Sequence, residues 1–122
     1  MQPKKTLVLG ASPNPDRAAF QAVARLAKNQ HEVIPFGIKK GNVEGIAILN
    51  QLPDQIENLD TVTLYLNPSA QEDYRAYIIK MKPKRVIFNP GTENKSFAQE
   101  LQKHGIETLF ACTLVMLSLK NY

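Results

Sequence analysis

Apolar residues gather in five short runs along the chain, and these runs are typical of strands. The runs cover Thr6–Gly10, Glu32–Phe36, Thr61–Leu66, Arg85–Asn89 and Glu107–Ala111. Aliphatic and β-branched residues follow one another in them almost without interruption, which is the pattern of strands covered on both faces of a parallel sheet. The sequence therefore predicts an open parallel sheet of about five strands.

Helical patterns lie between these strands. The spacing i, i+3, i+4, i+7 occurs twice, at Ala19, Ala22, Val23 and Leu26 and again at Tyr74, Tyr77, Ile78 and Met81. For the second helix, Pro68 suits the first helical position and Ser69 to Glu72 have the spacing of a capping box. A third helix is predicted over 93–104, ended by Gly105 as a left-handed cap.

Alternation of strand and helix in segments this short indicates parallel βαβ units with right-handed crossovers. The exception is Gly37–Asp60, for which we expect a loop, a short strand near Ile46–Leu49 and a helical turn near Leu52–Ile56. The predicted fold class is α/β, a doubly wound, Rossmann-like sheet, in a single domain over residues 1–122.

Composition and charge narrow the class of protein. The 122 residues are 43% hydrophobic and 21% charged, with a net charge of +4 and one cysteine, Cys112. A single cysteine excludes an internal disulfide, and we expect a reducing cytoplasm. The apolar stretch Leu109–Leu119 is shorter than the ~20 residues that a membrane-spanning helix needs. We therefore expect no membrane span, and interpret the stretch as a buried strand end followed by a helix.

The ligand of an open α/β sheet binds beyond the carboxyl ends of the strands, where the winding direction reverses. With a Rossmann-like order, the first and fourth strands flank that point. The residues that follow them are Gly10-Ala11-Ser12-Pro13 and Asn89-Pro90-Gly91-Thr92. Small turn-forming residues let backbone N–H groups approach an anion closely, although each segment also suits a plain strand-to-helix turn.

The first of these loops carries the strongest sign of anion binding. It reads GASPNPDR from Gly10 to Arg17 and contains a single glycine, so it is no GxGxxG motif. We expect Gly10 and Ala11 to bring the backbone close to a diphosphate, Ser12 to offer a hydroxyl, and Arg17 to contribute a guanidinium from the first helical turn.

The second strand ends in a segment that bears on the cofactor. Phe36 and Gly37 are followed by Ile38 and then Lys39 and Lys40, where an enzyme that uses NAD commonly has an acidic residue for the ribose hydroxyls. Two lysines suit a phosphorylated ribose, as in NADP or coenzyme A, and equally suit a solvated basic loop. After the third strand, Leu66-Asn67-Pro68 is both a helix cap and a candidate ligand contact.

Groups for catalysis are scarce. His31 and His104 fall near helix C-terminal ends, where a cation complements the helix dipole, and Cys112 stands alone in an apolar run. We assign no catalytic residue and no metal ligand. The basic run Lys80, Lys82, Lys84 and Arg85 is interpreted as a solvated loop at the opposite edge of the sheet, so nucleic acid is not an expected partner.

At these residues the chain resembles the small bacterial coenzyme A-binding proteins, whose Rossmann-like domain is also similar to the N-terminal part of the succinyl-coenzyme A synthetase α subunit. The resemblance runs nearly end to end. It is carried by the segments GASPNPDR (Gly10–Arg17), EVIPFG (Glu32–Gly37), NPGTEN (Asn89–Asn94) and ACTLVML (Ala111–Leu117).

The resemblance implies that Gly10, Ala11 and Ser12 meet the diphosphate of coenzyme A with Arg17 nearby. It also implies that Asn89-Pro90-Gly91 closes the other wall of the site. It implies binding of a small-molecule nucleotide without an established reaction, so carrier, sensor and enzyme-partner roles stay open, with a partner protein or a homo-oligomer compatible with each. The alternatives are an NADP-dependent reductase, for which no proton donor is visible, and a protein-interaction module with a vestigial pocket.

Overall fold

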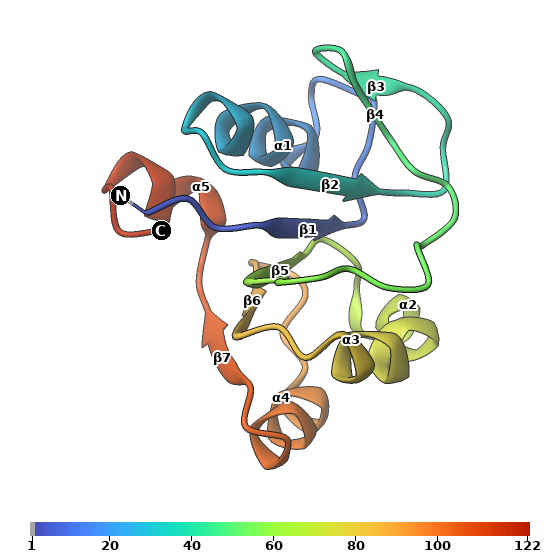
Figure 1. Cartoon of the computed structure of the whole chain (residues 1–122), viewed down its shortest axis with the longest axis vertical. Coiled ribbons are helices and arrows are strands. Elements are labelled where there is room, and N and C mark those ends of the chain that lie inside the picture. The colour runs from blue at the N-terminus through green and yellow to red at the C-terminus, as the bar shows by residue number, and fades with distance from the viewer. Residues whose placement is uncertain (1) are drawn as a thin grey trace.

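A five-stranded parallel sheet forms the centre of the computed structural model, which describes residues 2–122 (Figure 1). Its strands are β1 (Thr6–Leu9), β2 (Val33–Phe36), β5 (Thr61–Leu64), β6 (Arg85–Phe88) and β7 (Glu107–Phe110). Every residue of β1, β5 and β6 is buried, as expected for strands covered on both faces. The doubly wound α/β fold predicted from the sequence is confirmed.

Helices cover both faces of the sheet. Helices α1 (Ala18–Lys28) and α5 (Thr113–Ser118) pack on one face. The other face is covered by the segment α2 (Pro68–Gln71), η1 (Glu72–Tyr74) and α3 (Arg75–Met81), together with α4 (Lys95–Lys103). The two cores that result share the sheet, since alternate residues of each strand point to opposite faces.

The strand order is β2-β1-β5-β6-β7, so the neighbours of β1 are β2 and β5. The chain winds from β1 to β2, returns past β1 and continues outward from β5, which places the reversal between β1 and β5. The expectation that the first and fourth strands flank this point was wrong: β6, the fourth strand of the sheet, is separated from β1 by β5.

Helix ends follow local side-chain chemistry. Asn67 is the N-cap of α2, and its side-chain oxygen accepts a hydrogen bond from the N–H of Ala70 at 2.9 Å. Pro68 takes the first helical position as predicted, but the capping box predicted from Ser69 does not form, because Asn67 already fills that role. Gly105 has φ +76° after α4 and confirms the predicted left-handed cap.

The segment between β2 and β5 contains a small hairpin of β3 (Asn42–Val43) and β4 (Ile46–Ala47). The short strand predicted near residue 46 is therefore present, and its continuation pairs with the edge of β2 through a bridge between Phe36 and Leu49. The helical turn predicted over Leu52–Ile56 is absent, and the chain there has no regular hydrogen-bonding pattern.

The last strand and helix lie at an edge of the molecule. β7 pairs only with β6, and Phe110 at its end is 53% exposed, so the prediction of a buried strand end at Leu109–Leu119 was wrong on burial. The helix predicted there is α5. Within residues 2–122, no helix is both long enough and apolar enough to cross a membrane.

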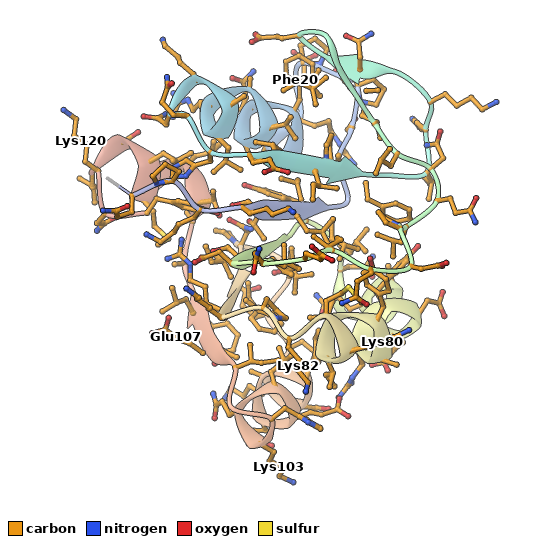
Figure 2. The ribbon with its side chains drawn as sticks, viewed as in Figure 1. Phe20, Lys80, Lys82, Lys103, Glu107 and Lys120 are labelled. Carbon is orange, nitrogen blue, oxygen red and sulfur yellow. The ribbon has the colours of Figure 1, made fainter. Side chains whose placement is uncertain are left out.

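A buried polar cluster lies at the amino ends of the strands. Arg85 is 8% exposed, donates from Nε to the Thr61 hydroxyl at 2.8 Å and lies 4.4 Å above the ring of Tyr122. It was wrongly assigned to a solvated loop; the other members of that basic run are exposed, and Figure 2 labels Lys80 and Lys82 beside α3.

His31 belongs to the same cluster. It is 4% exposed, and its Nδ1 accepts a hydrogen bond from the N–H of Lys4 at 2.9 Å. Burial is the main cause that lowers the pKa of His31, followed by the positive charges of Lys4 and Arg85. The residue is therefore a neutral core histidine, and the expectation that it complements a helix dipole as a cation was wrong.

Candidate functional site

A cavity of about 550 Å³ opens at the carboxyl ends of β1, β2 and β5, where the winding reverses. This volume lies within the ~300–1,000 Å³ common for small-molecule sites. Its walls come from three loops and the first helical turns after them. The lining residues are Gly10, Ala11, Ser12, Asn14, Arg17, Phe36, Gly37, Ile38, Lys39, Tyr65, Leu66, Ala70, Asp73 and Tyr74.

The floor of the cavity is the turn after β1. The N–H groups of Gly10 and Ala11 both donate to the carbonyl oxygen of Phe36, at 2.9 and 2.8 Å. These two N–H groups join the ends of β1 and β2, so they are already used within the protein. Gly10 has φ +101°, and a Cβ there would lie 3.0 Å from the backbone of Tyr65. The two residues shape the floor and bring three strand ends close together.

Gly37 is required by packing. A Cβ on this residue would lie 2.1 Å from the carbonyl oxygen of Ala11, a distance at which backbone atoms must move. The loop after β2 therefore rests directly on the loop after β1. Close backbone contact of this kind leaves the cavity above it open and its rim well defined.

Anion-binding groups gather where α1 begins. Ser12 lines the cavity, and its hydroxyl oxygen accepts a hydrogen bond from the N–H of Asn14 at 3.1 Å. Arg17 is the N-cap residue of α1, its side chain does not cap the helix, and it forms no ion pair within the described part of the chain. The guanidinium, the Ser12 hydroxyl and the positive end of the helix dipole together suit a phosphate group.

The wall beyond β2 combines apolar surface with one cation. Phe36 is buried, whereas Ile38 is 86% exposed and presents an aliphatic side chain at the rim. Lys39 lines the cavity, but Lys40 does not. Only one of the two lysines predicted to meet the ligand is therefore placed at the cavity.

The opposite wall comes from the segment after β5. Leu66 lines the cavity as predicted, whereas Asn67 and Pro68 lie outside it and serve the start of α2. The ring of Tyr74 meets that of Phe36 edge to face, with 5.5 Å between centroids, so the two walls touch.

Several lining residues were not predicted: Asn14, Ile38, Tyr65, Ala70, Asp73 and Tyr74. Three of them carry a signal in the sequence, since Ala70, Asp73 and Tyr74 have the i, i+3, i+4 spacing of one helical face. That face begins in α2, the first helix after β5, and the cavity lies at the end of β5.

The turn Asn89-Pro90-Gly91 lies outside the cavity. Asn89 is 1% exposed; its amide donates to the Thr63 hydroxyl at 2.6 Å, and its oxygen accepts from the N–H of Thr113 at 2.8 Å. Its side chain thus joins β5, β6 and α5. The role of these three residues in ligand binding stays a prediction, and in this structure Asn89 supports the neighbouring strand.

Tyr65 is a titratable residue of the cavity lining whose pKa is strongly raised. Burial raises the pKa of its hydroxyl far above the ordinary value, while the nearby hydroxyls of Thr63 and Thr113 act in the opposite direction. The group remains protonated at neutral pH. Cys112 is half-buried at the start of α5, and no hydrogen bond within residues 2–122 pairs its thiol with a base.

The chain matches known proteins over almost its whole length. The sequence model for the family described as "CoA binding domain" matches residues 4–118. A comparison with curated proteins finds no match.

Solved structures give the same fold. A crystal structure of an uncharacterized protein shares 52% identity with a TM-score of 0.96, and each chain covers 100% of the other. A hypothetical protein from Pyrococcus horikoshii OT3 shares 25% identity with a TM-score of 0.85, covering 97% of this chain and 84% of its own. A protein from Thermus thermophilus, at 24% identity and a TM-score of 0.84, covers 98% of this chain and 91% of its own.

Proposed function

We propose that this chain, which belongs to the CoA binding domain family, binds coenzyme A or an acyl-coenzyme A in the cavity above β1, β2 and β5. One observation carries this proposal. The cavity holds two cationic side chains on separate loops, Arg17 after β1 and Lys39 after β2, together with apolar surface from Phe36, Ile38 and Tyr74. Coenzyme A carries a diphosphate and a separate 3′-phosphate attached to largely uncharged groups, which matches that distribution.

The proposed pose follows the order of the loops. The diphosphate lies over the turn after β1, where the Ser12 hydroxyl and Arg17 face the cavity. The adenosine and its 3′-phosphate lie on the β2 side, near Ile38 and Lys39. The pantetheine arm then passes over the β5 side, along Leu66. Each charged group of the ligand meets a cation in this pose, and no phosphate is placed against Asp73.

The role we propose for the isolated protein is binding without catalysis. An acyl transfer or hydrolysis needs a nucleophile with a base in hydrogen-bond reach, and the Ser12 hydroxyl on the cavity is bonded to the N–H of Asn14 instead of to a base. Carrier, sensor and partner of an enzyme that acts on acyl-coenzyme A all suit such a domain. A single cysteine suits a reducing compartment, so we place this function in the cytoplasm.

NADP is the second candidate ligand, and Lys39 favours it over NAD. A lysine beyond β2 suits a 2′-phosphate on the ribose, whereas the acidic residue that would bind a free ribose diol is not found at this position. A reductase would also need a proton donor beside the nicotinamide. Among the lining residues, Tyr65 and Tyr74 are the candidates for that donor, and the Tyr65 hydroxyl lies near those of Thr63 and Thr113, outside the cavity lining.

Thermal unfolding with added ligand tests the proposal. At 100 times its dissociation constant, coenzyme A should stabilise the fold by roughly 2.7 kcal/mol and raise the melting temperature by several degrees. NAD at the same concentration should have a much smaller effect, and NADP an intermediate one. Equal shifts with NAD, or no shift with millimolar coenzyme A, would contradict the proposed function.

A matched pair of arginine variants locates the binding. Arg17→Ala should weaken the binding of coenzyme A and of its 3′-dephospho form in parallel, by about 10-fold or more, since a charged hydrogen bond contributes about 1.5 to 3 kcal/mol. Arg25→Ala removes an arginine from the same helix, but its guanidinium bonds Ser118 away from the cavity. It should leave both affinities unchanged, and an equal loss in both variants would point to a general charge effect.

A further inference from the structure

The loop that carries Lys39 is held by a side chain far from it in the sequence. The amide nitrogen of Asn50 lies 2.7 Å from the carbonyl oxygen of Gly37 and 3.1 Å from that of Lys39, and donates to both. Asn50 itself does not line the cavity. Its contacts fix the direction of two carbonyl groups on either side of Ile38.

Backbone contacts hold Asn50 in place against this loop. The N–H of Gly37 donates to the carbonyl oxygen of Leu49 at 3.0 Å, and the N–H of Leu49 donates to that of Pro35 at 2.9 Å. The residues just before Asn50 therefore continue the sheet beside β2 for one bridge, and Figure 1 shows the chain after β4 passing the end of β2. The position of the Asn50 amide follows from this pairing.

The far end of the same loop is fixed as well. The N–H of Ile48 donates to the carbonyl oxygen of Gly41 at 2.9 Å. A Cβ on Gly41 would lie 2.8 Å from the Cβ of Pro13, so the loop also packs against the turn after β1. Residues 37–41 are thus held at both ends, and Asn50 supplies the side-chain contact between these ends.

Carbonyl oxygens repel phosphate, whereas the lysine side chain attracts it. With the oxygens of Gly37 and Lys39 accepting from Asn50, neither is available to turn toward an anion in the cavity. We expect that, without this donor, the exposed part of the loop gains conformations in which Lys39 leaves the rim. The loop then loses order that ligand binding has to restore, at a cost in affinity.

We propose that Asn50 is a positioning residue, which holds the loop of residues 37–41 so that Lys39 meets the 3′-phosphate of coenzyme A. This inference rests on the proposed function. It assigns specificity for the phosphorylated ribose to a hydrogen-bond donor outside the cavity, on the segment that follows β4.

Calorimetric titration of coenzyme A and 3′-dephospho-coenzyme A into three proteins tests this role. The wild type should prefer coenzyme A by ~10-fold. Asn50→Leu, which has nearly the same shape and no donor, should bind coenzyme A about 3- to 10-fold more weakly and lose most of that preference, while its affinity for the dephospho form changes little. A purely structural role would weaken both ligands equally.

Asn42→Ala is the matched control. Asn42 lies in the hairpin that precedes Asn50 and accepts from the N–H of Gly45 at 3.1 Å, so its removal also loses one side-chain contact but leaves the hydrogen bonds from Asn50 to residues 37–41 in place. This variant should keep the wild-type preference. Retention of the preference in Asn50→Leu, its loss in Asn42→Ala, or its absence in the wild type would overturn the role of Asn50. A wild type that binds neither ligand would instead overturn the proposed function.

Discussion

At the scale of single residues, two lysines that are adjacent in the sequence contribute differently to the charge of the cavity. Lys39 lines the cavity and Lys40 does not, although both are exposed and both follow β2. Exposure alone therefore does not identify which of the two lysines lines the cavity. The position of each side chain relative to the cavity decides its contribution.

The two lysines should differ in their effect on ligand choice. Lys39→Ala should remove the ~10-fold preference for coenzyme A over its 3′-dephospho form, because it deletes the one lysine on the cavity. Lys40→Ala changes the net charge equally and should keep the preference. Calorimetric titration of both ligands measures it. Loss of the preference in Lys40→Ala and its retention in Lys39→Ala would show that the loop of residues 37–41 binds the phosphate in another conformation.

The sequence identified the cavity residues that a strand end places directly. Gly10 ends a predicted strand, Ser12, Gly37 and Lys39 follow one by a few positions, and all four line the cavity. Tyr74 was missed because it reaches the cavity from a helix, at a point that depends on how the helix packs across the sheet. Spacing along the chain shows which residues share a helical face, and tertiary packing decides what that face meets.

At the scale of elements, strand identity could be predicted and strand order could not. Each strand appears within one or two residues of its apolar run, because burial on both faces leaves a local signal. The order β2-β1-β5-β6-β7 depends on which crossover passes which edge, and no local pattern records it. We therefore expected the loop after β1 to lie beside the turn after β6. In the structure, the strand next to β1 is β5.

The structure gives Asn89 a clear structural effect. Asn89→Ala should lower the free energy of unfolding by about 1–3 kcal/mol, because the buried N–H of Thr113 loses its partner and the Thr63 hydroxyl keeps only its bond to the Thr113 hydroxyl. Chemical denaturation measures this change. The exposed Asn121→Ala should stay within about 0.5 kcal/mol of the wild type. If Asn89→Ala left the free energy of unfolding unchanged, the contacts that Asn89 makes between β5, β6 and α5 would contribute little to stability.

At the scale of the whole molecule, the sheet separates two polar regions. The cavity opens at the carboxyl ends of the strands, and the cluster of Arg85, His31 and Tyr122 is buried at their amino ends. In that cluster the hydroxyls of Thr6 and Tyr122 are 2.6 Å apart, so the described N-terminal and C-terminal segments meet there. Charged side chains such as Lys103 and Lys120 extend from the outside of the fold (Figure 2).

His31 should make stability depend on pH in a defined direction. Its pKa is lowered in the folded chain from the ordinary value of 6.5, so below about pH 6.5 the unfolded chain binds the proton more readily. The contribution of His31 is fully present above pH 6.5 and is lost as the pH falls toward the folded pKa.

The pH dependence can be assigned by substitution. His31→Gln, which keeps a hydrogen-bond acceptor, should flatten the fall in unfolding free energy as the pH decreases below 6.5. Denaturant titration at a series of pH values gives the slopes. An unchanged slope in His31→Gln would show that other groups titrate over this range.

The central claim is that coenzyme A occupies the cavity above β1, β2 and β5, and amide NMR of the labelled protein during titration with coenzyme A tests it most directly. We predict the largest shift changes at Gly10, Ser12, Gly37, Lys39 and Tyr65, saturating together at one dissociation constant. The hollow between α3 and α4, around Arg75 and Glu100, should change little. Changes centred on this hollow, or no changes at millimolar coenzyme A, would contradict the claim.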